Sequence, residues 1–174
     1  MVSRIMRIFK LDKTVFPEIA ADPKATTEAG IIVVVVSLLA GIAAGVQGGK
    51  FFNGLIWELI AGLVLGWLLW AVITFFVGTS LFRGKTTVEA MLRVLGYANA
   101  PRVLSIFGLI PCIGWIPTLI GGILSLIAGF IAVREAMQFD TGKAVITVLV
   151  GWLVYFVLTL ILAPIIGAGA FIFG

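Results

Sequence analysis

The chain has 174 residues, of which 61% are hydrophobic and only 11% are charged, and its mean hydropathy is +1.23. Charged residues make up about a quarter of a soluble domain, so this composition indicates an integral membrane protein. Histidine is absent and Cys112 is the only cysteine. The common zinc sites and the Ser–His or Cys–His nucleophile pairs are therefore excluded, and the sequence indicates neither a cofactor nor an enzyme.

Residues 1–26 are interpreted as a basic amphipathic segment followed by a linker on the cytosolic side. In a helix over 1–13, Val2, Ile5, Met6, Ile8 and Phe9 lie on one side, and Arg4, Arg7 and Lys10 lie on the other. Such a helix suits an anionic bilayer surface, and we expect Arg4, Arg7 and Lys10 to anchor it there. No apolar core follows the charges closely enough to predict a cleaved signal peptide.

Residues 27–174 are predicted to form an all-α membrane domain with five transmembrane helices. The predicted spans cover about 29–46, 54–82, 97–111, 118–133 and 144–166. Small residues repeat every four positions at Ser37, Gly41 and Gly45, and again at Gly121, Ser125 and Gly129. These stripes predict close contact between neighbouring helices.

The stretch before the third span predicts an amphipathic cytosolic helix over about 87–97. Thr86 and Glu89 fit a capping box, and Glu89, Arg93 and Tyr97 form a polar stripe at i, i+4 and i+8. We expect this helix to lie along the bilayer surface before the chain enters at Pro101. The alternatives are an ordinary cytosolic loop and an intrahelical Glu89–Arg93 pair.

The distribution of basic residues orients the predicted domain. Eleven of the twelve Lys and Arg residues fall before the first span, between the second and third, or between the fourth and fifth; only Lys50 falls opposite. The positive-inside rule then places the N-terminus in the cytoplasm and the C-terminus outside, in a multi-pass protein of the cell membrane. In the alternative topology the third segment is a re-entrant hairpin, with four crossings and a cytoplasmic C-terminus.

Glu58 is the only acid inside a predicted span. It lies about one turn from the outer end of the second helix, where a charge costs less than the roughly 2.5–3.5 kcal/mol expected at a helix centre. Gly54, Gly62 and Gly66 share an i+4 stripe with it, so Glu58 is expected to face a neighbouring helix. Two interpretations follow: an interfacial acid that reaches water, which the shallow depth favours, or an ion-responsive group in a cavity.

Around the central helix the sequence resembles a known family. Leu95-Gly96-Tyr97-Ala98-Asn99-Ala100-Pro101 before the third span, with a charged N-terminal segment and clustered spans, looks like the Yip (Ypt/Rab-interacting protein) domain family. The resemblance covers roughly 27–166 and implies an all-helical membrane protein with a cytosolic N-terminus. Eukaryotic relatives act in vesicle traffic and contact small GTPases. This chain lacks their Asp-Leu-Tyr-Gly-Pro segment, so GTPase binding is not carried over, and the compact form resembles prokaryotic members.

Two functional hypotheses follow. The first is a non-enzymatic membrane organiser whose cytosolic surface binds anionic lipid headgroups or a protein partner, with homo-oligomers a further possibility. Its candidate binding residues are Glu89, Arg93, Tyr97, Pro101 and Arg102, where Arg93 and Arg102 are suited to phosphate. The second is a small transporter or lipid-moving protein with a cavity near Glu58. The basic residues are explained by membrane orientation, so nucleic acid is not an expected partner.

Overall fold

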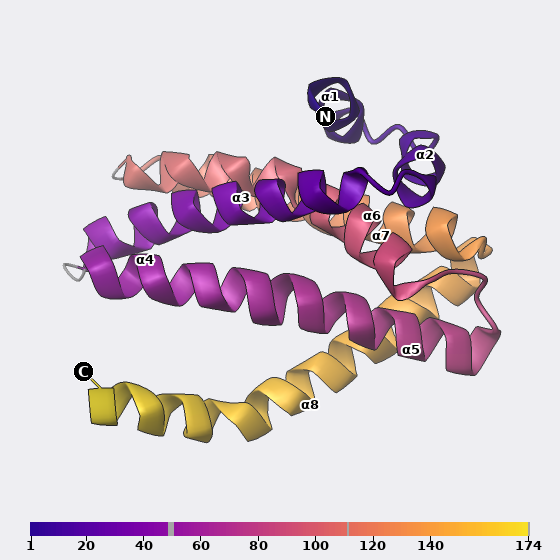
Figure 1. Cartoon of the computed structure of the whole chain (residues 1–174). Helices are drawn as coiled ribbons and strands as arrows, with labels where there is room; N and C mark the ends of the chain where they lie inside the picture. The colour runs from indigo at the N-terminus through magenta and orange to yellow at the C-terminus, as the bar shows by residue number, and fades with distance from the viewer. Residues whose placement is uncertain (49–50, 111, 174) are drawn as a thin grey trace.

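The structure, a computed structural model, describes residues 1–48, 51–110 and 112–173, and all its regular elements in these ranges are helices. Figure 1 shows them in chain order. The elements are α1 (Val2–Phe9), α2 (Val15–Ala21), α3 (Ala25–Gly48), α4 (Phe51–Ile60), the π-helix η1 (Ala61–Leu69), α5 (Trp70–Phe82), α6 (Val88–Ala98), the 3-10 helix η2 (Ala100–Leu109), α7 (Trp115–Met137) and α8 (Thr141–Phe173). The predicted all-α class is confirmed.

Four helical segments in the described part of the chain are long and apolar enough to cross a membrane. They cover Ala25–Val46, Leu55–Phe82, Trp115–Met137 and Thr141–Leu158. The second consists of α4, η1 and α5, which continue one another along a single rod (Figure 1). These four agree with the first, second, fourth and fifth predicted spans. Lys50, between the first two predicted spans, and Pro111, the last residue of the third, lie outside the described residues.

The third predicted span, 97–111, is not a continuous α-helix. α6 ends at Ala98, and Pro101 then lies in the first turn of η2. Proline lacks an amide hydrogen and disfavours the α conformation of the residue before it, which explains why the helix changes type here. In Figure 1, α6 starts at the end of the bundle where α5 finishes, and η2 runs on to the end where α3 finishes.

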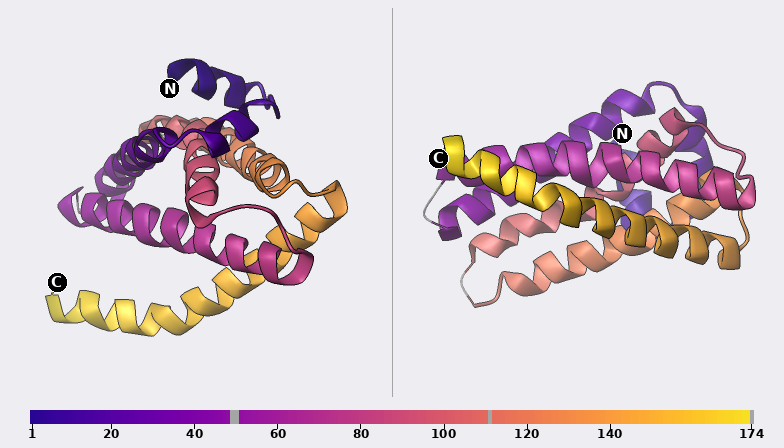
Figure 2. Two further views of the ribbon diagram at one scale, coloured as in Figure 1. Left: turned by 45° about the vertical axis from the view of Figure 1, so that its right-hand side comes forward. Right: turned by 90° about the horizontal axis from the view of Figure 1, so that it is seen from below.

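The two N-terminal helices lie against the outside of the bundle, over the region where α3 begins and α6 passes (Figures 1 and 2). α1 contacts α2, α6 and η2, and α2 contacts α6 and α7. Ile8, Val15, Phe16 and Ile19 are fully buried beneath them. The amphipathic helix predicted for residues 1–13 therefore buries part of its apolar side, including Ile8, against the rest of the protein. Val2 and Met6 on the same predicted side remain 69% and 56% exposed.

α6 lies inside the bundle rather than along its surface. It contacts α2, α3, α5 and α7, and its last five residues, Val94–Ala98, are all buried. The expectation that Tyr97 lies on an exposed polar face is wrong, since its side chain is fully buried. The capping residue also differs: Thr87, not Thr86, accepts the hydrogen bond from the amide of Ala90, at 3.2 Å.

Small residues bring α3 and α4 close together, as their spacing predicted. A Cβ atom at Gly41 would lie 2.9 Å from the Cα of Leu55, and one at Gly45 would lie 2.8 Å from the Cα of Phe51. Both distances are too short for a real side chain, so glycine is required at each position. On α7, Ser125 donates a hydrogen bond of 2.8 Å to the carbonyl of Ala98 and thereby joins α7 to α6.

Candidate functional site

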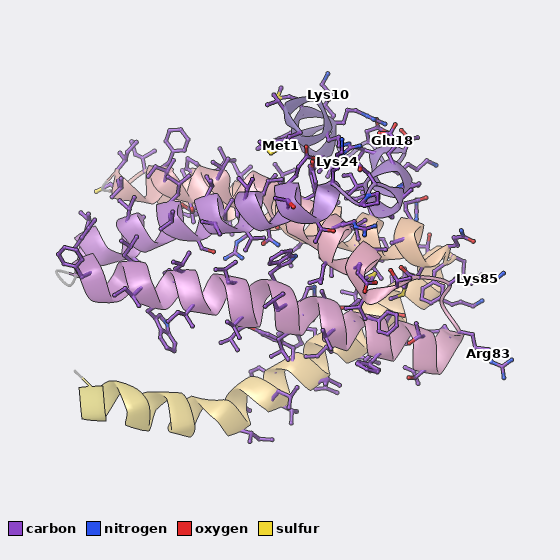
Figure 3. The ribbon with its side chains drawn as sticks, viewed as in Figure 1. Met1, Lys10, Glu18, Lys24, Arg83 and Lys85 are labelled. Atoms are coloured by element: carbon purple, nitrogen blue, oxygen red, sulfur yellow. The ribbon has the colours of Figure 1, made fainter. Side chains whose placement is uncertain are left out.

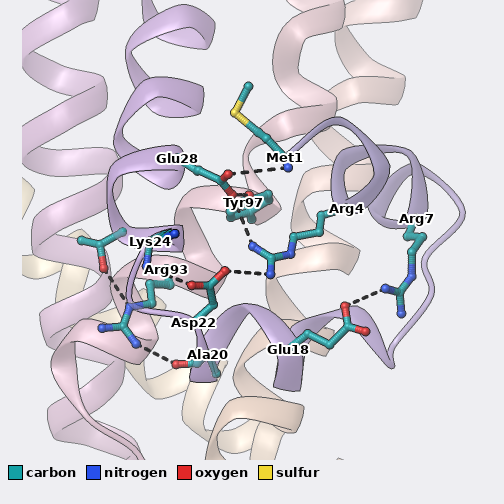
Figure 4. A network of polar contacts seen from close by, with 11 residues as sticks. Met1, Arg4, Arg7, Glu18, Ala20, Asp22, Lys24, Glu28, Arg93 and Tyr97 are labelled. Carbon is teal, nitrogen blue, oxygen red and sulfur yellow. Dashed lines mark hydrogen bonds and ion pairs between the residues drawn. The ribbon is translucent and has the colours of Figure 1, made fainter.

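Arg4 organises a polar cluster where α1 meets the start of α3 (Figure 4). Its guanidinium lies 2.8 Å from Asp22 Oδ2 and 3.3 Å from Glu28 Oε2. Glu28 also accepts a hydrogen bond from the buried hydroxyl of Tyr97, and the α-amino group of Met1 lies 3.6 Å away. Hydrogen bonds from Arg4 and from the Lys24 amide lower the pKa of Asp22, which favours its charged form.

Arg7 forms a second cluster that closes the turn between α1 and α2. Its Nε lies 2.8 Å from Asp12 Oδ2, its Nη1 lies 2.7 Å from Glu18 Oε2, and its Nη2 donates to the hydroxyl of Thr14 at 2.8 Å. Hydrogen bonds from Thr14 and Arg7 lower the pKa of Asp12 to about 2. Arg4 and Arg7 are thus occupied by acids of the chain itself, and of the three predicted membrane anchors only Lys10 is exposed without an ion-pair partner in the described residues.

Arg93 ties α6 to the N-terminal helices. Its Nε donates to the hydroxyl of Thr26 and its Nη1 donates to the carbonyl of Ala20, both at 2.8 Å. The predicted alternative of a Glu89–Arg93 ion pair is not formed within the described chain, and Glu89 is exposed. Figure 4 shows Arg93 pointing toward α2 and the start of α3, not toward the outside.

The Gly–Tyr…Pro signature is a packing device in this structure. A Cβ atom at Gly96 would lie 2.6 Å from the Cβ of Ala29, so only glycine permits α3 to approach α6 here. Pro101 is buried, and its carbonyl would lie 2.6 Å from a Cβ at Gly121. Among the predicted binding residues, Tyr97 and Pro101 are therefore buried, whereas Glu89 and Arg102 are exposed.

Lysines, in contrast to the two N-terminal arginines, point outward. Lys10, Lys13 and Lys24 are exposed, and none forms an ion pair with a residue that the structure describes. Arg83 and Lys85, which follow α5, are also exposed and unpaired within those residues. Figure 3 shows Lys10 above α1, Lys24 below α1 near the start of α3, and Arg83 and Lys85 at the end of the bundle. We call these five residues the basic surface.

A cavity lies between α3, α4, η2 and α7, toward the end of the bundle opposite Arg83 and Lys85. It has a volume of about 950 Å³, and both Glu58 and Arg102 line it. Glu58 packs against α3, with its Cβ 3.3 Å from the position of a Cβ at Gly41. The prediction that Glu58 faces a neighbouring helix is confirmed, and the acid lies at a cavity.

The polar lining of this cavity is incompletely paired. Arg102 donates to Asn99 Oδ1 at 3.4 Å, and neither Arg102 nor Glu58 forms an ion pair in the described part of the chain. The buried hydroxyl of Ser105, also on the lining, has no hydrogen-bond partner there. A buried polar group without a partner costs about 1–3 kcal/mol, so this lining favours a polar occupant.

An apolar groove of about 590 Å³ adjoins the cavity. The two share Arg102, Thr118, Leu119 and Gly122, so together they run along one side of α7. Farther along, the groove is lined by Trp70 of α5 and by Trp152 of α8. The combination of a charged cavity and an apolar groove suits an amphipathic molecule.

Sequence reasoning missed the partners that hold the N-terminal helices. The acids Asp12, Glu18, Asp22 and Glu28 follow Arg4 and Arg7 in the first 28 residues, and this balance of charges was the available signal. Ser105 on the cavity lining and Asn99 in the adjoining groove carried no signal of comparable strength. No group of three or more metal-ligating side chains occurs among the described residues.

Helices of this length and apolarity, with charges gathered at one end, define a multi-pass helical membrane protein. The Yip1 domain family matches residues 8–163, nearly the whole chain, and the protein belongs to this family. No curated protein and no solved structure matches the chain.

Proposed function

We propose that this protein is a non-enzymatic protein of the cell membrane whose basic surface binds anionic lipid headgroups. One observation carries the proposal. Arg4 and Arg7 form ion pairs with all four acids of the first 28 residues, namely Asp12, Glu18, Asp22 and Glu28, while Lys10, Lys13 and Lys24 form none within the described residues. Paired charges hold the fold together, and unpaired lysines near a bilayer each contribute about 1 kcal/mol to attraction toward anionic lipid.

α1 supports this proposal because of the residues that it leaves uncovered. Val2, Met6 and Lys10 are exposed and are spaced four residues apart, so they form one outward stripe. Two apolar side chains and one lysine on a single stripe suit the boundary between headgroups and acyl chains.

The proposal includes five crossings, with the N-terminus in the cytoplasm and the C-terminus outside. The third crossing would begin after Arg93, which bonds to the cytosolic Ala20. Val94–Ala98 of α6 and the ten residues of η2 rise by about 28 Å together, close to a hydrocarbon core of about 30 Å. Cysteines introduced singly at positions 3 and 172, in a Cys112→Ser background, should react with impermeant reagents from opposite sides. Reaction from the same side would refute this topology.

Lipid binding can be measured by electron paramagnetic resonance in bilayers that contain spin-labelled lipids. The parent protein should immobilise phosphatidylglycerol in preference to phosphatidylcholine. A variant with Lys10→Gln, Lys13→Gln and Lys24→Gln should show a weaker preference. The reduction should be at most about fivefold per lysine at low ionic strength. The preference that remains should depend less on salt concentration.

The matched control is Asp140→Asn with Lys143→Gln. This variant removes an ion pair of 3.5 Å elsewhere on the protein and leaves the net charge unchanged, so its lipid preference should equal that of the parent. An undiminished preference in the triple lysine variant would show that the three N-terminal lysines of the basic surface do not bind lipid, and would refute the observation on which the proposal rests.

A further inference from the structure

We propose that the cavity between α3, α4, η2 and α7 binds the headgroup of an aminophospholipid, with phosphate at Arg102 and the primary ammonium at Glu58. This site is separate from the basic surface. It draws on side chains that form no ion pair in the described chain, and it lies toward the opposite end of the bundle.

Charge complementarity identifies the headgroup. One cation and one anion line the same cavity without pairing with each other. An unpaired carboxylate inside a membrane protein is costly, so a cationic partner for Glu58 lowers the free energy. A zwitterionic headgroup supplies a phosphate and an ammonium together, so it satisfies both side chains in one binding event.

Hydrogen-bond chemistry indicates which zwitterionic headgroup fits the cavity best. A guanidinium can bind phosphate oxygens through two parallel N–H bonds. The unpartnered hydroxyl of Ser105 lies on the same lining and can donate to a phosphate or ester oxygen. Glu58 accepts hydrogen bonds from a primary ammonium but not from a quaternary one, so phosphatidylethanolamine should bind better than phosphatidylcholine.

The groove along α7 can hold the acyl chains of the bound lipid. Ile110, Trp115 and Leu119 line the cavity and are 49%, 63% and 52% exposed, so the cavity opens on the outer surface of the bundle. Beyond Gly122 the apolar groove continues toward Trp70 and Trp152. A lipid can therefore enter from the side, with its headgroup between the helices and its chains along α7.

Gly122 offers a way to block the site without disturbing the fold. A Cβ atom at this position meets nothing within 4 Å, and the residue borders both the cavity and the groove. Gly122→Leu should therefore fill the path of the lipid, whereas Gly122→Ala adds one methyl group to open space and serves as its control.

The experiment is native mass spectrometry of delipidated protein with equal amounts of phosphatidylethanolamine, phosphatidylcholine and phosphatidylglycerol of identical chains. The parent should bind phosphatidylethanolamine most tightly. Arg102→Gln should weaken binding of phosphatidylethanolamine at least tenfold, and Glu58→Gln should equalise phosphatidylethanolamine and phosphatidylcholine. Arg83→Gln and Glu89→Gln, which change the same charges at exposed positions outside the cavity, should behave as the parent.

Three results would overturn the proposal. These are equal binding of phosphatidylethanolamine and phosphatidylcholine by the parent, unchanged binding in Arg102→Gln, or unchanged binding in Gly122→Leu. Displacement of the lipid by an equal concentration of soluble phosphoethanolamine would also overturn it, because the chains would then contribute nothing. The triple lysine variant should retain the preference for phosphatidylethanolamine, which separates this site from the basic surface.

Discussion

Arg93→Lys tests whether Arg93 fastens the N-terminal helices or binds a ligand. In the structure, Arg93 donates hydrogen bonds of 2.8 Å to Thr26 and to Ala20, and it is half-buried. A lysine preserves the charge but cannot reach both acceptors with the geometry of a guanidinium. We therefore expect residues 1–27 to open more often in the variant, although the charge of the surface is the same.

The expected size of the effect follows from these two bonds. A hydrogen bond from a charged donor contributes about 1.5–3 kcal/mol, and lysine retains at most one of the two. The loss of one bond raises the opened population roughly 10- to 150-fold. Hydrogen exchange of peptides from residues 1–27, measured by mass spectrometry in nanodiscs, reports this population directly.

Arg83→Lys is the control, because Arg83 is exposed and forms no ion pair within the described residues. It should leave exchange over residues 1–27 unchanged. If Arg93→Lys exchanges like the parent, while Arg93→Gln loses selectivity for anionic lipid, then Arg93 binds lipid phosphate and the fastening role is refuted.

Two further predictions concern helix packing and pH. Gly41→Ala should lower the free energy of unfolding by about 1–3 kcal/mol, because its Cβ would lie 2.9 Å from the Cα of Leu55. Gly122→Ala should not lower it, since a Cβ there meets nothing within 4 Å. Equal stability of the two variants in thermal unfolding would contradict this packing. Asp12 and Asp22 have pKa values below the ordinary value of 3.8, so their stabilisation of the N-terminal helices is complete above pH 3.8. It is lost as the pH falls through the lowered pKa values, and the pKa of Asp12 is about 2. A spin label at position 10 should become mobile over that interval, and constant mobility would contradict the prediction.

The membrane helices could be predicted because each is specified by its own sequence. A long apolar run is typical of a membrane-crossing helix whatever surrounds it, and glycines repeated every four residues favour contact with a neighbouring helix. Gly41 and Gly45 meet α4 as that reasoning requires, and Glu58, which follows the same spacing, faces α3. Local pattern and tertiary contact agree at these positions.

α6 could not be predicted in the same way, because its partners are distant in sequence. Arg93 bonds to Thr26, 67 residues earlier, and Tyr97 bonds to Glu28, 69 residues earlier. Periodicity within 87–97 separates an apolar from a polar side, but it does not show that α2 and α3 cover the polar side. For the same reason Arg4 and Arg7 were predicted to anchor the chain to the membrane, whereas in the structure they form ion pairs with acids of the N-terminal segment.

The π-helix η1 gives the second membrane helix a place where its length can change. Its nine residues lie between α4, which carries Glu58, and α5, which packs against α6 and α8. A π-helix accommodates an additional residue in its wider turn, so deleting one residue from Ala61–Leu69 would let the segment revert to α-helical hydrogen bonding while α4 kept its orientation. Deleting one residue from α5, which is α-helical, would instead rotate everything upstream by about 100° and shift it by about 1.5 Å. Glu58 would then turn away from Gly41, and Gly62 would lose its place against Ser37. Chains of the family whose second membrane helix differs by one residue should therefore carry the difference between Ala61 and Leu69.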